Sequence, residues 1–452
     1  MAAPQTHPSG KRRPNILWVF GDQHRAQATG YRGDPNVRTP HLDALSRFGV
    51  RFDNAVAGAP WCVPFRGALL TGRYPHRVGA VSTPARLDPA HYPTIAQPFK
   101  DAGYHTAYIG KWHLGGSNAE HIIPENERGG FDYWMGFETG NQPYNCPIHG
   151  TDAPELTRLP GYQTDALTDL TLRHLRAHVG EAGSDYDPFF TVLSVQPPHD
   201  PYVAPGCDHR HNPATLQLRP NVPEVSRVQA RARADLAGYY AMIENLDRNL
   251  GRLLEGLRKL GVDRDTWIFF FSDHGDCHGA HGLFRKSNPF EESIRIPLVI
   301  AKASPEAGSW HHISRSVVNH IDLAPTALGL CGLEAPAAFV GHNYASEIAP
   351  DALQPVAEAP DSAYLQQIVP KLHTAGLDTA WRGIVTRDGW KYVCTPAMRW
   401  LLFNLNEDPY EQVNLALMSE FTVERERLHA QLADWIARTG DDFSLPTTGP
   451  IT

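Results

Sequence analysis

Short apolar runs alternate along this chain with longer segments in which apolar residues recur every three or four positions. The short runs are of strand length and rich in β-branched and aromatic residues, as buried strands are. They lie at 14–23, 106–109, 189–195, 267–272 and 296–301. Helical periodicity marks 39–48, 229–260, 317–331 and 422–438. Strands separated by helices predict an α/β fold with a large, mainly parallel sheet sandwiched by helices.

Three of the predicted strands lead into residues that carry chemistry. The first is followed by Asp22, the run at 189–195 by His199, and the run at 267–272 by Asp273 and His274. In sheets of this kind, ligands bind beyond the carboxyl ends of the strands. The pattern therefore predicts a functional site at that edge.

The pattern changes in the last quarter of the chain. Residues 333–380 are rich in Ala and Pro and are expected to connect two parts. Short strands are expected near 381–386, 390–394 and 400–404, before the closing helix. We therefore predict a catalytic α/β domain at 1–350 and, at 351–452, a small α+β subdomain with an antiparallel sheet.

Composition and charge narrow the class of protein. The 452 residues are 42% hydrophobic and 20% charged, an ordinary globular balance. A net charge of −8 argues against nucleic-acid binding. No apolar run reaches the roughly 20 residues of a membrane span, and none of signal-peptide length follows Met1, so we expect a cytoplasmic protein with no membrane partner. The six cysteines are scattered without a C-x-x-C pair, and reduced thiols are expected.

The strongest local pattern is the segment CVPFRGALLTGR at 62–73. Pro64 suits the first turn of a helix, which places Cys62 at or just before the helix N-terminus. Arg66 lies about one turn further on. A nucleophile, a helix N-terminus and a guanidinium in one place suit a tetrahedral oxyanion. A buried structural cysteine is the alternative that spacing alone leaves open.

This segment resembles the signature of the sulfatase family, in which the cysteine of a Cys-x-Pro-x-Arg motif is oxidised to formylglycine. Leu70-Thr71-Gly72-Arg73 also matches, whereas Phe65 stands where Ser or Ala is commoner. The resemblance implies an alkaline-phosphatase-like fold, a formylglycine formed from Cys62, and a formylglycine-generating enzyme as maturation partner.

Other family motifs follow in the family's order. The resemblance implies a divalent metal held by Asp22, Gln23, Cys62, Asp273 and His274, and catalytic roles for Cys62, Arg66, Lys111, His113, His199 and Lys286. An extended segment would point Lys111 and His113 the same way. Taken singly, each residue has a structural alternative: a turn cap, a core histidine or a surface lysine. Spacing alone also allows a zinc site made by Asp273, His274, Cys277 and His278.

Two positions depart from the commonest family pattern. Gln23 and His274 are neutral where acidic or amide residues are frequent. The oxygen ligands favour Ca²⁺, with Mg²⁺ possible, and the imidazole raises the chance of Mn²⁺. Similar pairs occur in the related phosphonate monoester hydrolases, which lack the Lys-x-His motif. Lys111 and His113 therefore favour sulfate ester hydrolysis over the alternatives, a phosphonate monoester or phosphodiester hydrolase and a non-catalytic binding protein.

The resemblance also implies a mechanism. The hydrated aldehyde, a gem-diol, is the nucleophile, and the metal lowers its pKa. Arg66, Lys111 and Lys286 neutralise the sulfuryl oxygens. His199, together with Lys286, protonates the leaving alcohol, and His113 removes the proton that lets sulfate depart.

The substrate is expected to be a small-molecule or saccharide sulfate ester. We expect specificity from loops at 114–162 and 200–230 and from C-terminal residues near Trp381 and Arg382. The aromatic residues of the first loop could stack on a sugar or aryl ring or simply pack the loop; they are Trp134, Tyr144, His149 and Tyr162. In the second loop His209 and Arg210 could meet an anionic substrate or remain solvated.

Overall fold

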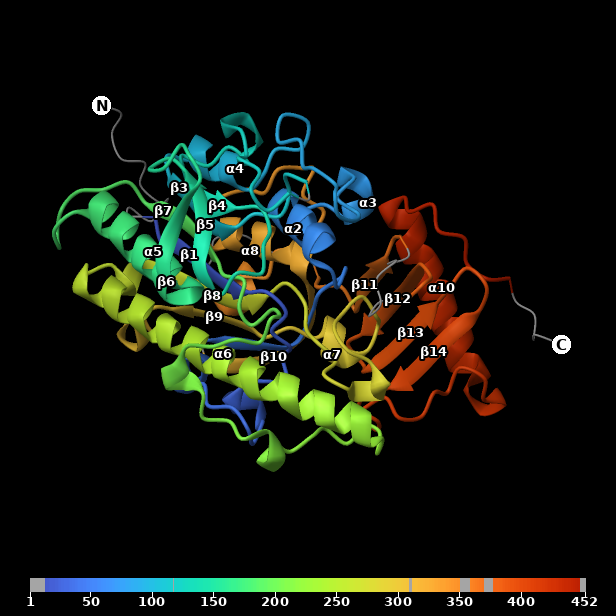
Figure 1. Ribbon diagram of the computed structural model, residues 1–452. Helices are drawn as coiled ribbons and strands as arrows, with labels where there is room; N and C mark the ends of the chain where they lie inside the picture. The colour runs from blue at the N-terminus through green and yellow to red at the C-terminus, as the bar shows by residue number, and fades with distance from the viewer. Residues whose placement is uncertain (1–12, 117, 309–310, 350–357, 370–376, 448–452) are drawn as a thin grey trace.

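The computed structural model describes residues 13–116, 118–308, 311–349, 358–369 and 377–447, which form one sheet of ten strands and one of four (Figure 1). The large sheet comprises β1 (Asn15–Gly21), β2 (Val50–Val56), β3 (His105–Lys111), β4 (Tyr133–Phe137), β5 (Tyr144–Gly150), β6 (Thr157–Tyr162), β7 (Phe189–Ser194), β8 (Thr266–Ser272), β9 (Leu298–Lys302) and β10 (His312–Asn319). The small sheet comprises β11 (Ser362–Gln367), β12 (Trp381–Thr386), β13 (Trp390–Cys394) and β14 (Arg399–Asn404).

The large sheet has the strand order β10-β2-β9-β8-β1-β7-β3-β4-β5-β6. Its centre, from β8 through β1, β7 and β3 to β4, is parallel throughout. Towards its margins β9 runs antiparallel to β8 and β2, and β5 runs antiparallel to β4 and β6. The predicted fold class is confirmed, with the parallel part concentrated where the strands are most buried.

Helices cover both faces of this sheet because its strands alternate their side chains between two cores. In β1, Ile16 and Trp18 point into the core under α2, α4 and α8, while Leu17 and Val19 point into the core under α1, α5 and α6. The helices are α1 (Pro40–Phe48), α2 (Cys62–Thr71), α3 (Pro75–Val78), α4 (Ala96–Asp101), α5 (Gln163–Val179), α6 (Ser226–Lys259), α7 (Glu291–Ile294), α8 (Leu323–Leu330), α9 (Ala345–Ile348) and α10 (Thr422–Thr439).

The predicted helix over 317–331 is wrong at its start. Val317 and Val318 belong to β10 and pair in parallel with β2. Asn319 then forms a capping box with Asp322, whose carboxylate accepts the Asn319 N–H at 2.8 Å, and α8 begins only after this turn. Periodicity could not separate a short β-branched run from the helix that follows it.

Two segments expected to lack regular structure contain strands. The expected loop 114–162 holds β4, β5 and β6, and the expected connection 333–380 holds β11. In β6 most residues are at least partly exposed, so the alternation that marks a half-buried strand is weak there.

The small sheet is antiparallel and packs against α10 on one side. Its core also takes in Ala68 and Tyr74, so α2 and the residues just beyond it contact the C-terminal part of the chain. The predicted boundary at 350/351 lies outside the described residues.

No helix among the described residues combines the length and the apolar character needed to cross a membrane.

Candidate active site

The centre of the large sheet delivers the first group of predicted residues. Gly21, at the end of β1, pairs with Ser272, at the end of β8, so the residues that follow both strands lie side by side. Asp22 and Asp273 are fully buried there. The backbone N–H of Gln23 donates to Asp273 Oδ1 over 2.9 Å, which ties the two strand ends together.

Cys62 is the first residue of α2 and is directed at the same point. Its Sγ lies 3.3 Å from His274 Nε2 and 3.5 Å from Asp22 Oδ1. Pro64, in the first turn, lacks only an N–H that has no partner within the helix. The predicted position of Cys62 at a helix N-terminus agrees with the structure, and the thiol is almost fully buried among the predicted metal ligands.

Arg66 lies one turn further along α2 and faces protein groups rather than open space. Its Nη2 donates to Asp22 Oδ2 at 3.3 Å and to Asp273 Oδ2 at 3.4 Å. Its Nη1 donates to the Lys111 carbonyl and to Ser194 Oγ, both at 2.8 Å. This geometry holds the two carboxylates in place, and the contact of Arg66 with sulfuryl oxygens stays a prediction.

The two predicted lysines enter from opposite sides. Lys111, the last residue of β3, places Nζ 2.6 Å from Asp22 Oδ2. Lys286 donates to Gln23 Oε1 at 2.9 Å and lies 3.3 Å from Cys62 Sγ. Burial alone would raise the pKa of the Asp22 carboxyl, but Lys111 and Lys286 together hold that pKa well below its usual range.

His113 reaches the site by a route that the sequence did not predict. Its φ of 57° takes the chain out of the extended conformation, so the argument from strand alternation with Lys111 was wrong. The ring is nevertheless buried, and its Nδ1 has no hydrogen-bond partner among the described residues. Burial, with the nearby charges of Lys111 and Arg66, lowers the pKa of His113 well below its usual range. The neutral ring is suited to accept a proton.

His199 lies nearer the surface than the other predicted catalytic groups. Its side chain is 12% exposed, against 6% for Lys286. Nδ1 faces the Asp200 carbonyl oxygen at 2.7 Å, which places a proton on Nδ1 and frees Nε2. In the substrate-free protein, burial of the ring and the positive charge of Lys286 lower the pKa of His199.

The predicted metal ligands fit a divalent ion. Candidate ligand atoms of Asp22, Cys62, Asp273 and His274 all lie within 4.8 Å of one another, and all four residues are buried. Two carboxylates, an imidazole and a neighbouring amide oxygen, Gln23 Oε1, form an oxygen-rich donor set of the kind that binds Ca²⁺, Mg²⁺ or Mn²⁺.

The zinc alternative is corrected. Cys277 accepts from Asn288 Nδ2 at 3.1 Å, and His278 Nε2 faces Asp276 Oδ2 at 3.6 Å. Neither residue belongs to the group of close ligand atoms around Asp273 and His274, because the chain turns away after Gly275.

Asp276 is a residue of this site to which the sequence alone assigned no role. Its Oδ2 accepts from Gln23 Nε2 at 2.7 Å and from the Tyr202 hydroxyl at 2.6 Å. Its Oδ1 accepts the backbone N–H groups of His278 and Arg285. The signal was available: Asp276 follows directly after the ligands Asp273 and His274, across a glycine.

That glycine is required by close packing. A Cβ at Gly275 would lie 2.0 Å from the Glu292 carbonyl oxygen. Any larger residue would push apart the turn that carries His274 on one side and Asp276 on the other.

Most of the predicted specificity residues are not accessible. Trp134, His149 and Tyr162 are buried and pack within the protein, whereas Tyr144 is exposed. Trp381 and Arg382 are also buried, and Arg382 donates to Asp441 Oδ2 at 2.7 Å and Oδ1 at 3.0 Å. These two side chains therefore stabilise the C-terminal part of the chain, and a specificity role for the residues near them stays a prediction.

Hydrogen bonds to backbone carbonyls hold two predicted residues of the second loop in place. His209 contacts the Ala204 carbonyl at 2.8 Å, and the exposed Arg210 contacts the Cys207 carbonyl at 3.3 Å. Beside His199, a narrow recess is lined instead by amide side chains, those of Asn141, Gln163 and Gln196.

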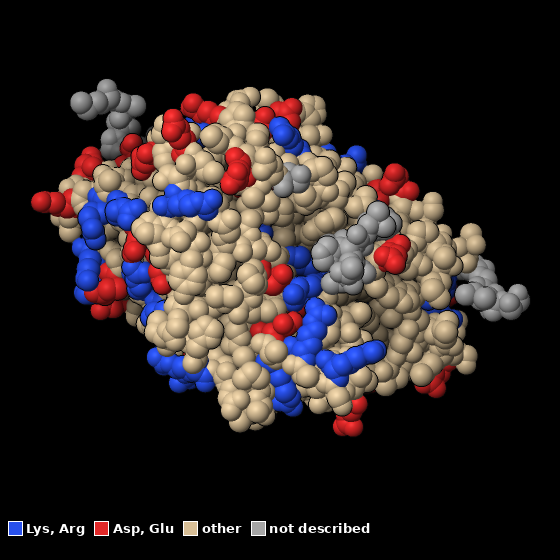
Figure 2. Space-filling model, viewed as in Figure 1, with Lys and Arg blue, Asp and Glu red and all other residues tan. Residues whose placement is uncertain are grey.

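The face drawn in Figure 2 carries basic side chains at its central hollow, with acidic side chains among them. Figure 2 shows Lys and Arg side chains around the hollow over α7, between the large sheet and the C-terminal sheet. Such a patch attracts anions towards this face.

Comparison with known proteins adds to this geometry. Residues 14–333 match the family model described as Sulfatase, and residues 279–438 match the one described as N-sulphoglucosamine sulphohydrolase, C-terminal. The chain is 34% identical to the ulvan-active sulfatase of Formosa agariphila over 436 residues, covering 95% of this chain and 82% of the relative.

Solved structures agree with this match over nearly the whole chain. The chain is similar to the sulfatase yidJ of Bacteroides fragilis, with a TM-score of 0.82, 25% identity and 98% of each chain covered. It is also similar to a Bacteroides thetaiotaomicron protein from work on the metabolism of multiple glycosaminoglycans. Here the TM-score is 0.82 at 26% identity, covering 95% of this chain and 97% of the other.

Proposed function

The chain belongs to the sulfatase family and hydrolyses sulfate esters, and we propose that its substrate is a sulfated saccharide. The observation that carries the saccharide is the buried amide oxygen of Gln196 beside His199, which has no hydrogen-bond partner among the described residues and is suited to accept from a sugar hydroxyl. The relative named for its action on ulvan, 34% identical over almost the whole chain, supports the same class.

Two groups complete the site in this proposal. A formylglycine made from Cys62 by a formylglycine-generating enzyme supplies an aldehyde hydrate as nucleophile. A divalent ion, Ca²⁺ in our proposal, supplies positive charge that binds sulfate oxygen and acidifies the hydrate, held by Asp22, Gln23, Cys62, Asp273 and His274. The buried cluster of their ligand atoms fits such an ion.

The side chains around Cys62 bind and orient the sulfate group. Each lysine Nζ carries three donor protons, so Lys111 and Lys286 keep donors for sulfate oxygens beyond those that contact Asp22 and Gln23. Their charges stabilise negative charge on the sulfuryl oxygens in a water-poor site. Arg66 positions Asp22 and Asp273 beside the sulfate group.

Two histidines move protons in this proposal. His199, near the mouth, donates from Nε2 to the leaving oxygen of the alcohol, with Lys286 beside it. An anionic substrate next to His199 raises the pKa of that ring, which the free site holds low. His113, neutral and with a free ring nitrogen, accepts the proton whose removal allows sulfate to leave.

The substrate class is tested with matched sulfate esters on protein co-produced with a formylglycine-generating enzyme. Released sulfate is measured for glucosamine 6-sulfate, a sulfated oligosaccharide, choline sulfate and 4-nitrophenyl sulfate. We expect kcat/KM for a saccharide to exceed that for choline sulfate by about tenfold or more, as a site built for hydroxyl groups discriminates strongly. A preference for choline sulfate would contradict the saccharide assignment and leave the sulfatase activity standing.

A further inference from the structure

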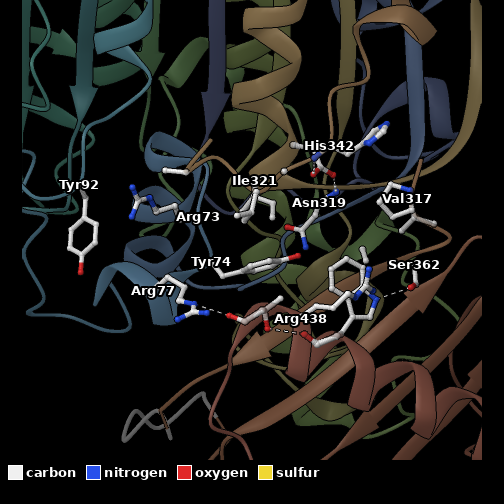
Figure 3. A pocket seen from close by; sticks show the side chains of 18 of the residues that line it. Arg73, Tyr74, Arg77, Tyr92, Val317, Asn319, Ile321, His342, Ser362 and Arg438 are labelled. Atoms are coloured by element: carbon white, nitrogen blue, oxygen red, sulfur yellow. Dashed lines mark hydrogen bonds between the residues drawn. The ribbon is translucent and has the colours of Figure 1, made fainter. Parts of the chain in front are cut away.

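A second pocket, of about 730 Å³, lies at the junction of the catalytic part and the C-terminal sheet (Figure 3). We call it the junction pocket; its walls include Arg73, Tyr92, Ile321, Ser362 and Trp435. It shares no lining residue with the active site described above. Since α2 spans ten residues from Cys62 to Thr71, about 15 Å of helix separates Cys62 from this pocket.

The pocket is rich in arginine. Arg73 and Arg77 form no ion pair with any carboxylate of the described residues. The Nε of Arg73 is buried without a hydrogen-bond partner among them, and its guanidinium carbon lies 5.5 Å from the centre of the Tyr92 ring. The charge of Arg73 is therefore not neutralised by a carboxylate of the described residues, and its terminal guanidinium nitrogens can bind an anion.

Arg77 and Arg438 add further positive charge to the pocket. Arg77 donates from Nε to the Thr439 carbonyl at 2.8 Å and keeps its terminal nitrogens for other partners. Arg438 stacks on Trp435 at 4.1 Å and pairs with Asp434, and both members of that pair are more than half exposed. An exposed pair of this kind neutralises little charge.

The carboxyl group in the wall does not cancel this charge. Asp322 lines the pocket, but its two oxygens already accept the backbone N–H groups of Asn319 and His342, at 2.8 and 2.7 Å. Burial raises the pKa of Asp322 to about 7, despite those two hydrogen bonds. The described walls therefore keep a net positive charge.

The remaining walls are aromatic and apolar. Trp435 already contacts Arg438 and stacks on Tyr364, so Tyr92 is the ring that can pack on a ligand, and Val317 and Ile321 add branched side chains. Such surfaces pack against a ring, while guanidinium groups bind carboxylate or sulfate in a fork geometry. The ligand therefore has an anionic group carried on a ring.

We propose that the junction pocket binds an anionic sugar, by a carboxylate or sulfate group held by Arg73 and Arg77 and a ring packed on Tyr92. That the ring is a sugar rests on the proposed function, whereas the anion site does not. The sugar can be a free monosaccharide or one unit of a longer chain.

The test uses the full-length Cys62→Ala protein, which cannot turn the probes over. Glucuronic acid, glucosamine 6-sulfate and neutral glucose are titrated by calorimetry, and a sulfated oligosaccharide follows to separate a free sugar from a chain unit. Hydrogen exchange with each probe locates binding. We expect the anionic sugars, but not glucose, to protect segments 73–77 and 435–439.

Variants assign the binding to the pocket. We expect Arg73→Gln to raise the Kd of the anionic sugars for the junction pocket at least tenfold. Arg73→Lys should restore most of this affinity. Arg227→Gln, a matched exposed arginine on α6, should leave it unchanged. Arg73 makes no hydrogen bond that the fold depends on, and an unchanged melting temperature checks this.

The outcomes separate this proposal from the proposed function. The pocket proposal is overturned if no anionic probe, at millimolar concentration, protects either segment from hydrogen exchange. It is also overturned if Arg73→Gln binds the anionic sugars as tightly as the parent protein. Hydrolysis of saccharide sulfates by the mature enzyme is measured independently and bears only on the proposed function.

Discussion

The side-chain amide of Gln23 donates to Asp276 Oδ2 over 2.7 Å, and this hydrogen bond decides which way the amide points. With its nitrogen held by a carboxylate, Gln23 must turn its oxygen to Lys286 and the metal ligands, where Lys286 Nζ lies 2.9 Å away. Asp276 is therefore a positioning residue for Gln23, and it directs the amide oxygen of this predicted ligand towards the proposed metal site.

Replacing Asp276 with asparagine reverses this orientation. Its Oδ1 must still accept two backbone N–H groups, so in Asp276→Asn the new NH₂ faces Gln23 and forces the Gln23 amide to flip. We expect metal affinity to fall about 10–100-fold, the usual cost of losing such support. Calorimetric titration of metal-free protein measures it, with exposed Asp265→Asn as control. Unchanged metal affinity would rule out the positioning role.

The contribution of His199 to kcat/KM is predicted to be larger for substrates with poorer leaving groups. A sugar alkoxide must be protonated as it leaves, whereas nitrophenolate leaves readily without a proton. We expect His199→Ala to lower kcat/KM for a saccharide sulfate by about 10²–10⁴ and for 4-nitrophenyl sulfate far less. His209→Ala in the neighbouring loop should change neither. Equal losses on both substrates would remove His199 from the proton-donor role.

Buried histidines predict weaker stability in acid. His320 is stacked on Phe65 and accepts the Gly58 N–H at Nδ1, and burial lowers its pKa to about 3. The unfolded state then binds the proton more tightly, so this residue's contribution is full above about pH 6.5 and is lost as pH falls towards 3.

Between pH 7 and 5, His320 alone should cost roughly 2 kcal/mol of unfolding free energy. His320→Asn keeps an acceptor for Gly58 but does not titrate, so its stability should fall less over that interval. Urea unfolding at both pH values measures the difference, with exposed His91→Asn as control. Parallel pH profiles for wild type and His320→Asn would contradict the assignment.

Arg382 is predicted to stabilise the fold without selecting the substrate. It is buried against Asp441, whose carboxylate also accepts from Tyr364 and Gln366. Arg382→Ala leaves this carboxylate short of its charged partner, and we expect a loss of about 3–5 kcal/mol. KM of the protein that remains folded should not change. A raised KM at unchanged stability would restore Arg382 to the substrate site.

The sequence predicted the central strands and the residues that follow them, because buried parallel strands are continuous apolar runs and ligands collect at their carboxyl ends. Asp22, Cys62, Asp273 and His274 meet as expected. The strands β4–β6 escaped prediction for different reasons: β6 is mostly exposed and carries only weak alternation, whereas β4 is a buried run of only five residues. The turn at Asn319 escaped it because a β-branched run and a helix share apolar composition.

Side-chain direction was the least predictable part of the site. Gln23, His113 and Arg285 have positive φ, which for non-glycine residues is set by surrounding contacts and not by local sequence. The hydrogen bonds of Arg66 to carboxylates and of Arg382 to Asp441 depend on partners far away in the chain. Periodicity and motif spacing report neither.

The measurement that tests this account most directly compares kcat/KM for 4-nitrophenyl sulfate and a 4-nitrophenyl phosphonate monoester. The protein is co-produced with a formylglycine-generating enzyme, and Cys62→Ala serves as the blank. We predict a clear preference for the sulfate and no turnover by Cys62→Ala. A preference for the phosphonate, or undiminished activity of Cys62→Ala, would contradict the account.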